Sequence, residues 1–577
     1  MTEPNPNPRT RTESLLLVAF CGFLLFYGLG AFGLLGADEP RYAQVAREML
    51  DRGDWITPTL NGKPWLEKPP LYYWQAMASF RVARAFPSTR SARSGQALPS
   101  QTANQGGTGA DGTRGDVPIN DGMREQAARF PGALDAALMI AAIYFFLRRF
   151  RPGSELDGAL ITVSCVGVIG YAHAAATDMP LTATFGIALL AWFAWYERQR
   201  RLDLAIFYIA LALGTLAKGP VAPALAAVII LLFLAAKRDW RAVLQTLWIP
   251  GIALFFVLAL PWYIAVQLRN PEFFRFFILE HNLARFSTNV YHHPQPFWFY
   301  LPVFLLALAP WTIWLLAAIV ERVRLIVREG RKAFASPDDA WPLFLLIWML
   351  VPVLFFSASQ SKLPGYILPA VPAAALLVIE YLAARREQGS RISLALAIAH
   401  GLLCGGLIFA ALSAARILMA TPRRLTFDKG TYVAAAIAIV FAIVIAVVLV
   451  TRAGARLLRS ATMFAVVISV AAVVRLAAPV IDATQSSRPV AETIQSFSHE
   501  QVPVALYHVS RVHQYGLDFY LNRPTQIYDA GEIPPGPHVL VVASNSEPAL
   551  TTLLPGRKVS HLTSIPAQKL ELYWVGR

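Results

Sequence analysis

Long apolar stretches alternate with short polar connections through the chain up to about residue 480. About 20 apolar residues suffice to cross the hydrocarbon core of a bilayer as a helix. The stretches that we expect to cross lie at about 15–36, 130–147, 158–176, 181–196, 204–217, 221–236, 243–267, 297–320, 341–357, 365–383, 392–418, 431–450 and 461–480. The pattern predicts a mainly α-helical, polytopic membrane protein with about 13 transmembrane helices.

Clusters of lysine and arginine set the predicted orientation. They lie at 148–151, 198–201, 237–241, 322–332, 385–391 and 452–459. Positive residues gather in cytoplasmic loops, so each cluster marks a connection on that side. The first apolar stretch is long for a signal peptide, so we expect it to stay uncleaved with the N-terminus in the cytoplasm. The odd number of crossings then places the C-terminus outside.

One apolar stretch, from Pro70 to Phe86, is expected not to cross. It is short and carries Arg81 and Arg84. If it crossed, the cluster at 148–151 would move outside and the alternation of loops would fail. We therefore predict an interfacial helix on the non-cytoplasmic face.

Two segments depart from the apolar pattern. Residues 88–121 are rich in Ser, Gly, Thr and Gln and predict a flexible insertion. From residue 481 to 577 no stretch could span a membrane. Short β-type and helix-like stretches alternate there and predict a small α/β domain outside the membrane. The expected strands and helices lie at 502–507, 538–543, 570–575, 489–498 and 548–554.

Composition narrows the class of protein further. Of the 577 residues, 56% are hydrophobic and 15% are charged, with a mean hydropathy of +0.47. Soluble domains carry roughly 25% charged residues, so an ordinary cytosolic protein is excluded, as is a disordered one. The net charge of +15 does not indicate nucleic acid, because the cations sit in short connections between apolar stretches. Cys21, Cys165 and Cys404 lie in apolar stretches, so no disulfide or zinc knuckle is expected.

The first external loop, residues 37–70, concentrates charges outside the cytoplasmic clusters. It opens with Asp38 and Glu39, and we expect Asp38 to cap a helix that starts there. Capping and a catalytic role of the same carboxylate are compatible. Glu67 and Lys68 stand before a double proline that stiffens the backbone. They form either an interfacial ion pair worth little or a cationic contact for the phosphate of a membrane lipid.

Further acids, bases and a tyrosine occur in other external loops. They are Asp178, Lys218, Glu280, His281, Arg285, Lys362 and Tyr366. A single interfacial cation usually just extends its charge to water. Five loops with such residues indicate one polar cavity that opens outward, with carboxylates on one side and cations on the other. His281 is either a solvated loop histidine or, with Glu67, a ligand of a divalent metal, because no metal-binding spacing decides between them.

Three motifs resemble those of a known family. They are DEPRYAQVAREM after the first membrane helix, then LNGKPWLEKPPLYYW, and later SKLPGYILPAVPA. They resemble the polyprenyl-phosphate-dependent glycosyltransferases of the C-type membrane fold. Within that group they are most similar to the bacterial transferases of 4-amino-4-deoxy-L-arabinose (aminoarabinose) to lipid A. The resemblance implies a transmembrane glycosyltransferase domain at 1–480 and a periplasmic domain at 481–577, and it does not extend to the insertion at 88–121.

The resemblance also implies roles for individual residues. Asp38 and Asp178 take the places of the two external catalytic acids. Glu67 and His281 match positions that can hold a divalent metal such as zinc. The residues that would bind the substrate and its lipid-linked phosphate are Arg41, Tyr42, Lys68, Lys218, Arg285 and Tyr366.

The implied activity is the transfer of aminoarabinose from undecaprenyl phosphate to lipid A phosphate on the periplasmic face of the inner membrane. This modification of lipopolysaccharide implies resistance to polymyxin and cationic peptides. Related transferases that act on protein or another glycan share the first-loop acid, so that class stays open. A lipid or sugar transporter is a further alternative, although the sequence has no inverted repeats or broken mid-membrane helices.

The expected role of Asp38 depends on the acceptor. Loss of undecaprenyl phosphate builds negative charge that Lys68 and Arg285 are suited to stabilise. A hydroxyl acceptor needs a general base, which Asp38 could supply. A phosphate monoester is largely dianionic at neutral pH and needs none. For that acceptor we expect Asp38 to orient the sugar through its hydroxyls or its cationic amino group.

Overall fold

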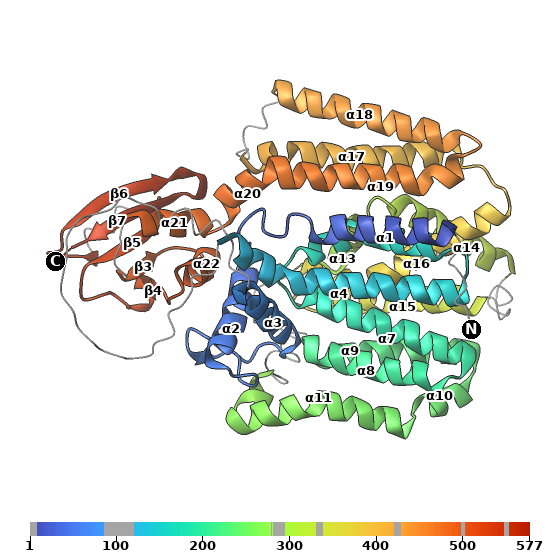
Figure 1. Ribbon diagram of the computed structural model, residues 1–577, viewed down its shortest axis with the longest axis horizontal. Helices are drawn as coiled ribbons and strands as arrows, with labels where there is room; N and C mark the ends of the chain where they lie inside the picture. Colours follow the sequence, from blue (N-terminus) through green and yellow to red (C-terminus); the bar gives the residue numbers. More distant parts are fainter. Residues whose placement is uncertain are drawn as a thin grey trace.

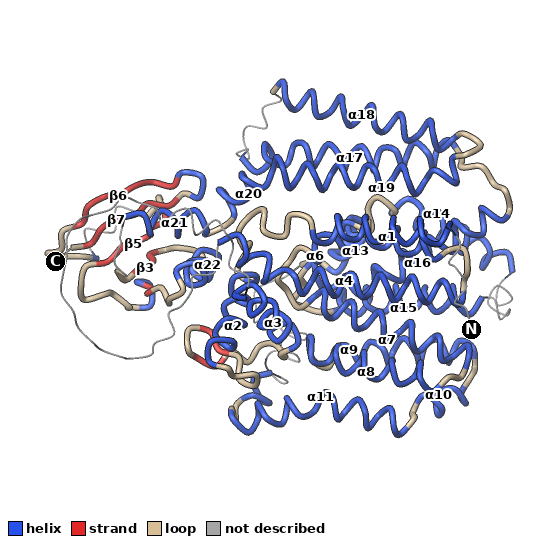
Figure 2. The backbone as a smooth tube through the Cα atoms, viewed as in Figure 1, coloured by secondary structure: helices blue, strands red, loops and turns tan. Residues whose placement is uncertain are grey.

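The computed structural model describes residues 8–85, 121–277, 280, 295–329, 339–419, 428–497, 502–546 and 553–576. A large helical bundle forms one end of the molecule and a small α/β unit the other (Figure 1). Within these residues, strands occur in that unit and in a short hairpin beside α2 (Figure 2). The predicted insertion at 88–121 lies outside the described residues except for Asp121, which starts α4 (Asp121–Phe150).

In the described residues, the bundle and the segment after α1 consist of helices with one short hairpin. Besides α4, the elements are α1 (Pro8–Phe26), α2 (Asp38–Arg52), β1 (Thr59–Leu60), β2 (Lys63–Pro64), α3 (Leu71–Ala85), α5 (Glu155–Val163), α6 (Val166–Ala172), α7 (Asp178–Arg198), α8 (Arg201–Lys218), α9 (Val221–Lys237), α10 (Trp240–Thr246), α11 (Ile249–Arg269), α13 (Tyr300–Ala307), α14 (Thr312–Glu329), α15 (Ala340–Ala358), α16 (Val371–Glu387), α17 (Leu394–Met419), α18 (Lys429–Val450), α19 (Gly454–Ala472) and α20 (Ala478–Gln485).

Among the described residues, 8 helices are long and apolar enough to cross a membrane. The number rises to 10 if two bent pairs, α5 with α6 and α13 with α14, each form one span. The predicted crossings at 15–36, 204–217 and 221–236 coincide with the helices α1, α8 and α9, which are shorter or less apolar than those 8. The mainly helical, multi-pass architecture is thus confirmed, whereas the count of 13 stays a prediction.

Burial distinguishes central from peripheral helices. The apolar window of α7 is 89% buried within the protein, whereas those of α11 and α18 are 22% and 28% buried. An apolar helix with so few protein contacts is stable only where its surroundings are apolar, as in lipid. The centre around α7 is filled by aromatic rings, with Trp192 and Phe193 packed against Phe344. The helix that begins with Asp178 is therefore anchored within the bundle along most of its length.

The C-terminal unit is a mixed five-stranded sheet with two helices. Its elements are α21 (Arg488–Phe497), β3 (Val504–Tyr507), α22 (Arg511–Leu521), β4 (Gln526–Ile527), β5 (His538–Ala543), β6 (Val559–Ile565) and β7 (Leu570–Val575). The strand order is β4-β3-β5-β7-β6, with β4, β3 and β5 parallel and the other two pairings antiparallel. The expected strands at 502–507, 538–543 and 570–575 and the expected helix at 489–498 are confirmed. The helix expected at 548–554 falls mostly outside the described residues.

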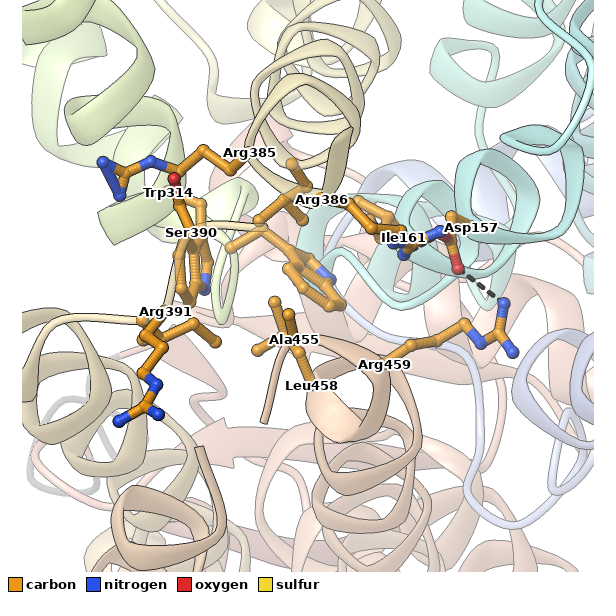
Figure 3. A pocket seen from close by; sticks show the side chains of 13 residues that line it. Asp157, Ile161, Trp314, Arg385, Arg386, Ser390, Arg391, Ala455, Leu458 and Arg459 are labelled. Carbon is orange, nitrogen blue, oxygen red and sulfur yellow. Dashed lines mark hydrogen bonds and ion pairs between the residues drawn. The ribbon is translucent and has the colours of Figure 1, made fainter. Parts of the chain in front are cut away.

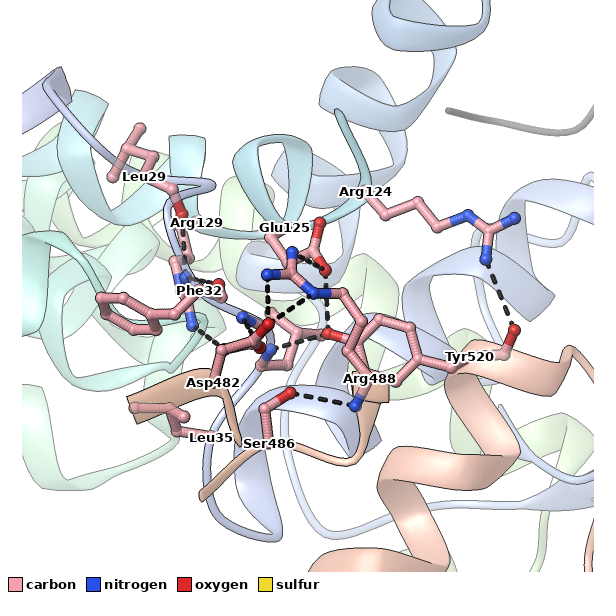
Figure 4. A network of polar contacts seen from close by, with 12 residues as sticks. Leu29, Phe32, Leu35, Arg124, Glu125, Arg129, Asp482, Ser486, Arg488 and Tyr520 are labelled. Carbon is pink, nitrogen blue, oxygen red and sulfur yellow. Dashed lines mark hydrogen bonds and ion pairs between the residues drawn. The ribbon is translucent and has the colours of Figure 1, made fainter. Parts of the chain in front are cut away.

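A polar network fastens this unit to the loop that leads into α2 (Figure 4). The hydroxyl of Tyr520 accepts a hydrogen bond from the Leu34 amide at 2.8 Å and donates to Glu125 at 2.9 Å. The carboxylate of Asp482 accepts from the Gly33 amide at 2.8 Å and pairs with Arg488. The start of α2 is consequently fixed from both the bundle and the α/β unit.

Candidate active site

Two adjacent acids at the start of α2 have different environments. The predicted capping role of Asp38 is wrong, because Ala37 occupies the N-cap position and Asp38 is the first helical residue. The Asp38 side chain is 51% exposed and pairs with Arg41 one turn later. A carboxylate in the first turn of a helix still interacts favourably with the helix dipole. Asp38 is therefore fixed by the helix yet open to a ligand.

The neighbouring acid, Glu39, is buried and fully engaged. Its two oxygens accept from Arg129 of α4 at 2.7 and 3.1 Å and from the amides of Leu35 and Ala175 at 2.7 Å each. Arg129 also donates to the carbonyls of Leu29, Phe32 and Gly33. Sequence reasoning missed this pair. Arg129 precedes a predicted crossing and belongs to no cytoplasmic cluster, which was the available signal.

A second acid of the candidate site lies at the start of α7. Asp178 lies 2.6 Å from the ammonium of Lys218 at the end of α8. Lys218 also faces the ring of Tyr366, 4.5 Å from its centroid. Gly365 packs so tightly here that a Cβ would lie 2.6 Å from a carboxylate oxygen of Asp178. Three predicted site residues, which stand far apart in the sequence, thus meet.

Tyr171 of α6 is near residues of both groups, and its ring packs against Gly365. Its hydroxyl is within electrostatic reach of Asp38, Asp178 and Tyr366. The nearby Tyr300 donates to the Leu363 carbonyl at 3.0 Å, which holds the chain leading to Tyr366. The two predicted catalytic acids therefore border one polar region.

Arg41 forms a cationic wall of this region. Its guanidinium faces the rings of Tyr42, Trp65 and Tyr515 at 5.3, 4.9 and 5.5 Å. Burial alone would lower the pKa of Arg41, but the negative charges of its neighbours, Asp38 among them, outweigh this effect and raise it. The buried Arg41 Nε has no hydrogen-bond acceptor among the described residues. This leaves a donor for an anionic ligand, and Tyr515 shows that α22 contributes to the wall, which sequence reasoning also missed.

The remaining predicted residues divide into three groups. Tyr42 is buried against Tyr72 and Tyr73, and its burial and the charge of Asp38 raise its pKa, so it stays a protonated phenol. Lys68 is buried, with 8% of its surface exposed. Arg285 and His281 lie outside the described residues.

The metal site also rests on those residues. The carboxylate of Glu67 lies close enough to Arg41 for its charge to act on the guanidinium. No group of three or more His, Cys, Asp or Glu side chains suited to a metal gathers within the described part of the chain. With His281 outside that part, a metal held by Glu67 and His281 stays a prediction.

Comparison with known proteins agrees with the motifs. Residues 119–264 match the model of the dolichyl-phosphate-mannose-protein mannosyltransferase family. The undecaprenyl phosphate-alpha-4-amino-4-deoxy-L-arabinose arabinosyl transferase of Pseudomonas aeruginosa (strain UCBPP-PA14) is 30% identical over 70% of this chain and 65% of its own length. A protein of the same name, numbered 2, from Pseudomonas fluorescens (strain Pf0-1) is 32% identical over 64% and 60%. The chain thus matches somewhat less than two thirds of these relatives, and the resemblance inferred from the motifs is confirmed.

The fold has solved counterparts. The crystal structure of ArnT from Cupriavidus metallidurans bound to undecaprenyl phosphate superposes with a TM-score of 0.71 at 20% identity, over 98% of both chains. The apo structure of that protein gives a TM-score of 0.68 over the same shares. The predicted C-type glycosyltransferase fold is confirmed, including the presence of a C-terminal sheet unit.

Proposed function

We propose that this protein transfers aminoarabinose from undecaprenyl phosphate to a phosphate of lipid A, on the periplasmic face of the bacterial inner membrane. The observation that carries the proposal is the convergence of Asp38 and Asp178 with the cations Arg41 and Lys218 on one polar region. The sugar and the carrier in this proposal are those for which the similar transferases are named. The modified lipopolysaccharide would carry less negative charge and bind polymyxin and cationic peptides more weakly.

The orientation forms part of the proposal. With 13 crossings and cytoplasmic arginine clusters, the loop that carries Asp38 and the C-terminal α/β unit both face the periplasm. The polyprenyl tail would lie among the helices, with its phosphate at the level of Arg41 and Lys218. Lys68 and Arg285 are proposed to complete the phosphate contacts.

The reaction exchanges two bonds at the anomeric carbon of the sugar. An oxygen of the lipid A phosphate forms the new bond, and the bond to the undecaprenyl phosphate oxygen breaks. Negative charge grows on the departing phosphate, where a lysine supplies a point charge and an arginine a fork of donors. The unpartnered Nε of Arg41 is one such donor.

Asp38 is proposed to orient the sugar rather than to act as a base. The acceptor phosphate is already largely ionised at neutral pH and has no proton that must be removed. The half-exposed carboxylate of Asp38 can accept a hydrogen bond from the cationic 4-amino group. Asp178 pairs with Lys218 and would thereby fix the ammonium group of Lys218 relative to the donor phosphate. No step depends on the predicted metal.

A second candidate is transfer of a sugar to a hydroxyl of a protein or glycan. The match to the mannosyltransferase family over residues 119–264 favours it. In that reaction the hydroxyl proton must be removed, and Asp38 would act as the general base.

Reconstitution distinguishes these candidates. The purified chain is mixed with undecaprenyl-phosphate-linked aminoarabinose and lipid A, and the product is identified by mass spectrometry. We expect modified lipid A, loss of product with Asp38→Asn, and retention with Asp51→Asn, a matched control at an exposed position of the same helix. Absence of product with lipid A, but transfer to a hydroxyl acceptor, would establish the second candidate instead.

A further inference from the structure

Three aromatic rings form a cage around the guanidinium group of Arg41, and they come from different segments. Tyr42 follows Arg41 on α2, Trp65 directly follows β2, and Tyr515 belongs to α22 of the C-terminal unit. Their ring centroids lie 5.3, 4.9 and 5.5 Å from the guanidinium carbon. The Arg41 side chain is only 15% exposed. A cation that faces aromatic rings and is largely removed from water is attracted more strongly than an exposed one.

The cage holds Arg41 without supplying a countercharge. In the bundle, by contrast, Asp157 pairs with Arg386 at 2.6 Å and with Arg459 at 2.5 Å, so these arginines are held by a carboxylate (Figure 3). An aromatic face attracts a cation through its quadrupole and carries no net charge. The carboxylate of Asp38 contacts only Nη2 of Arg41 and is itself half exposed. Much of the positive charge of Arg41 is therefore left for a ligand.

Three buried donors in and beside the cage lack an acceptor in the described part of the chain. They are Nε of Arg41, the indole Nε1 of Trp65 and the hydroxyl of Tyr73. Tyr73 of α3 lies within electrostatic reach of Arg41, and its ring centroid is 6.2 Å from that of Tyr42. Buried donors without acceptors cost free energy and are uncommon in folded proteins. Three of them near one cation indicate a ligand that brings acceptor oxygens and negative charge, as a phosphate group does.

We propose that Tyr515 is a positioning residue for the phosphate of the lipid-linked donor and acts through Arg41. This inference rests on the proposed function, which places that phosphate at the level of Arg41. Tyr515 and Trp65 fix the direction of the guanidinium, so that its free donors face the phosphate before the ligand arrives. Tyr515 is itself held close to α2, because Arg47 donates to the Phe519 carbonyl of α22 at 2.8 Å. The C-terminal unit thereby takes part in binding the donor.

Binding of undecaprenyl phosphate to the purified full chain in detergent micelles tests this role. Tyr515→Leu removes the ring and should weaken binding about tenfold, whereas Tyr515→Phe keeps a ring and should bind within about twofold of the wild type. Trp574→Leu is the matched control. Trp574 is another partly buried aromatic residue of the C-terminal unit and packs against the same core cluster, but its ring does not face Arg41 among the described contacts. This control should bind as the wild type does.

A double-mutant cycle with Arg41→Gln separates positioning from a general loss of structure. If Tyr515 acts through Arg41, Tyr515→Leu should weaken binding no further once Arg41 has been replaced. A tenfold loss in both backgrounds would overturn the proposal. Wild-type affinity of Tyr515→Leu, or equal losses in Tyr515→Leu, Tyr515→Phe and Trp574→Leu, would also overturn it.

A second measurement keeps the test decisive if Tyr515→Leu does not fold. Replacement of Tyr515 by phenylalanines with one, two or three ring fluorines keeps the shape of the ring and reduces the negative charge of its face. Affinity should fall with each fluorine, and an unchanged affinity would refute the cage. The assay contains neither sugar nor acceptor. Failure of the ring variants to differ would therefore leave transfer to lipid A intact, whereas a wild type that does not bind undecaprenyl phosphate would refute the proposed carrier and this inference with it.

Discussion

Replacing each of the two adjacent acids at the start of α2 by its amide should have opposite effects on stability and on transfer activity. Glu39→Gln should destabilise the protein strongly. Asp38→Asn should leave stability nearly unchanged and abolish transfer. The contrast follows from burial, since Asp38 is half exposed with one charged partner, whereas Glu39 accepts four hydrogen bonds next to a buried arginine.

The cost of Glu39→Gln can be worked out from its contacts. Each carboxylate oxygen accepts from one nitrogen of Arg129 and one backbone amide, of Leu35 or Ala175. In either orientation, a glutamine would place its NH₂ group against two donors. The Arg129 guanidinium, 1% exposed, would keep its charge without a counter-ion. Breaking a buried ion pair in this way costs about 3–5 kcal/mol, whereas an exposed pair such as Asp38–Arg41 contributes about 0–1 kcal/mol.

The assay is equilibrium unfolding in mixed micelles, followed by tryptophan fluorescence, together with transfer activity of the same preparations. Replacing both partners, as in Glu39→Gln/Arg129→Met, removes the uncompensated charge and should restore part of the stability lost in the single variant. Equal unfolding free energies for Glu39→Gln and Asp38→Asn would refute this account. So would full stability of Glu39→Gln with loss of transfer, because that result would make Glu39 a catalytic residue.

Four further predictions concern the proposed reaction and topology. Asp38→Asn should impair transfer of aminoarabinose far more than transfer of a neutral pentose from the same carrier, each relative to the wild-type rate for that donor; equal proportional losses would argue for a base or a structural role. Lys218→Gln should raise the activation free energy of reconstituted transfer by about 2–4 kcal/mol, measured as a fall in kcat/KM, which is the scale for loss of a charge stabiliser; near-normal turnover would remove Lys218 from the site. Gly365→Ala should cost about 1–3 kcal/mol in unfolding free energy and reduce transfer, because its Cβ would meet Asp178. Gly106→Cys should react with an impermeant maleimide in intact spheroplasts, and labelling only after lysis would show that the stretch from residue 70 to 86 crosses the membrane.

The apolar pattern was sufficient to predict the bundle because a membrane helix satisfies its own backbone and shows its composition directly. In the C-terminal unit the buried strands β3, β5 and β7 were equally visible. Two strands were missed for physical reasons. β6 lies at the edge of the sheet and has many polar, exposed residues, and β4 has only 2 residues and so no readable alternation.

The candidate site was predictable to the extent that its charges stand outside the lysine and arginine clusters. That criterion found Asp38, Asp178 and Lys218, which the fold brings to one region. It could not show which of two neighbouring acids turns inward, because burial of Glu39 depends on Arg129, 90 positions away. Nor could it separate structural cations from those that are proposed to face the substrate. Lys362, for example, donates to the carbonyls of Ser359 and Gln295, so it holds the loop before Tyr366.

Contacts between distant segments make the C-terminal unit part of the candidate active site rather than an appended module. Arg47, on the helix that carries Asp38, donates to the Phe519 carbonyl at 2.8 Å, and Asp518 accepts from Asn61 at 2.9 Å. Tyr515, which like Asp518 and Phe519 belongs to α22, faces the guanidinium of Arg41. Apolar side chains join the same two segments, because Val45 and Met49 of α2 lie in one buried core cluster with Leu517 of α22. The bundle supplies Asp178 at the start of α7 and Lys218 at the end of α8, and the C-terminal unit packs against the helix that carries Asp38 and Arg41.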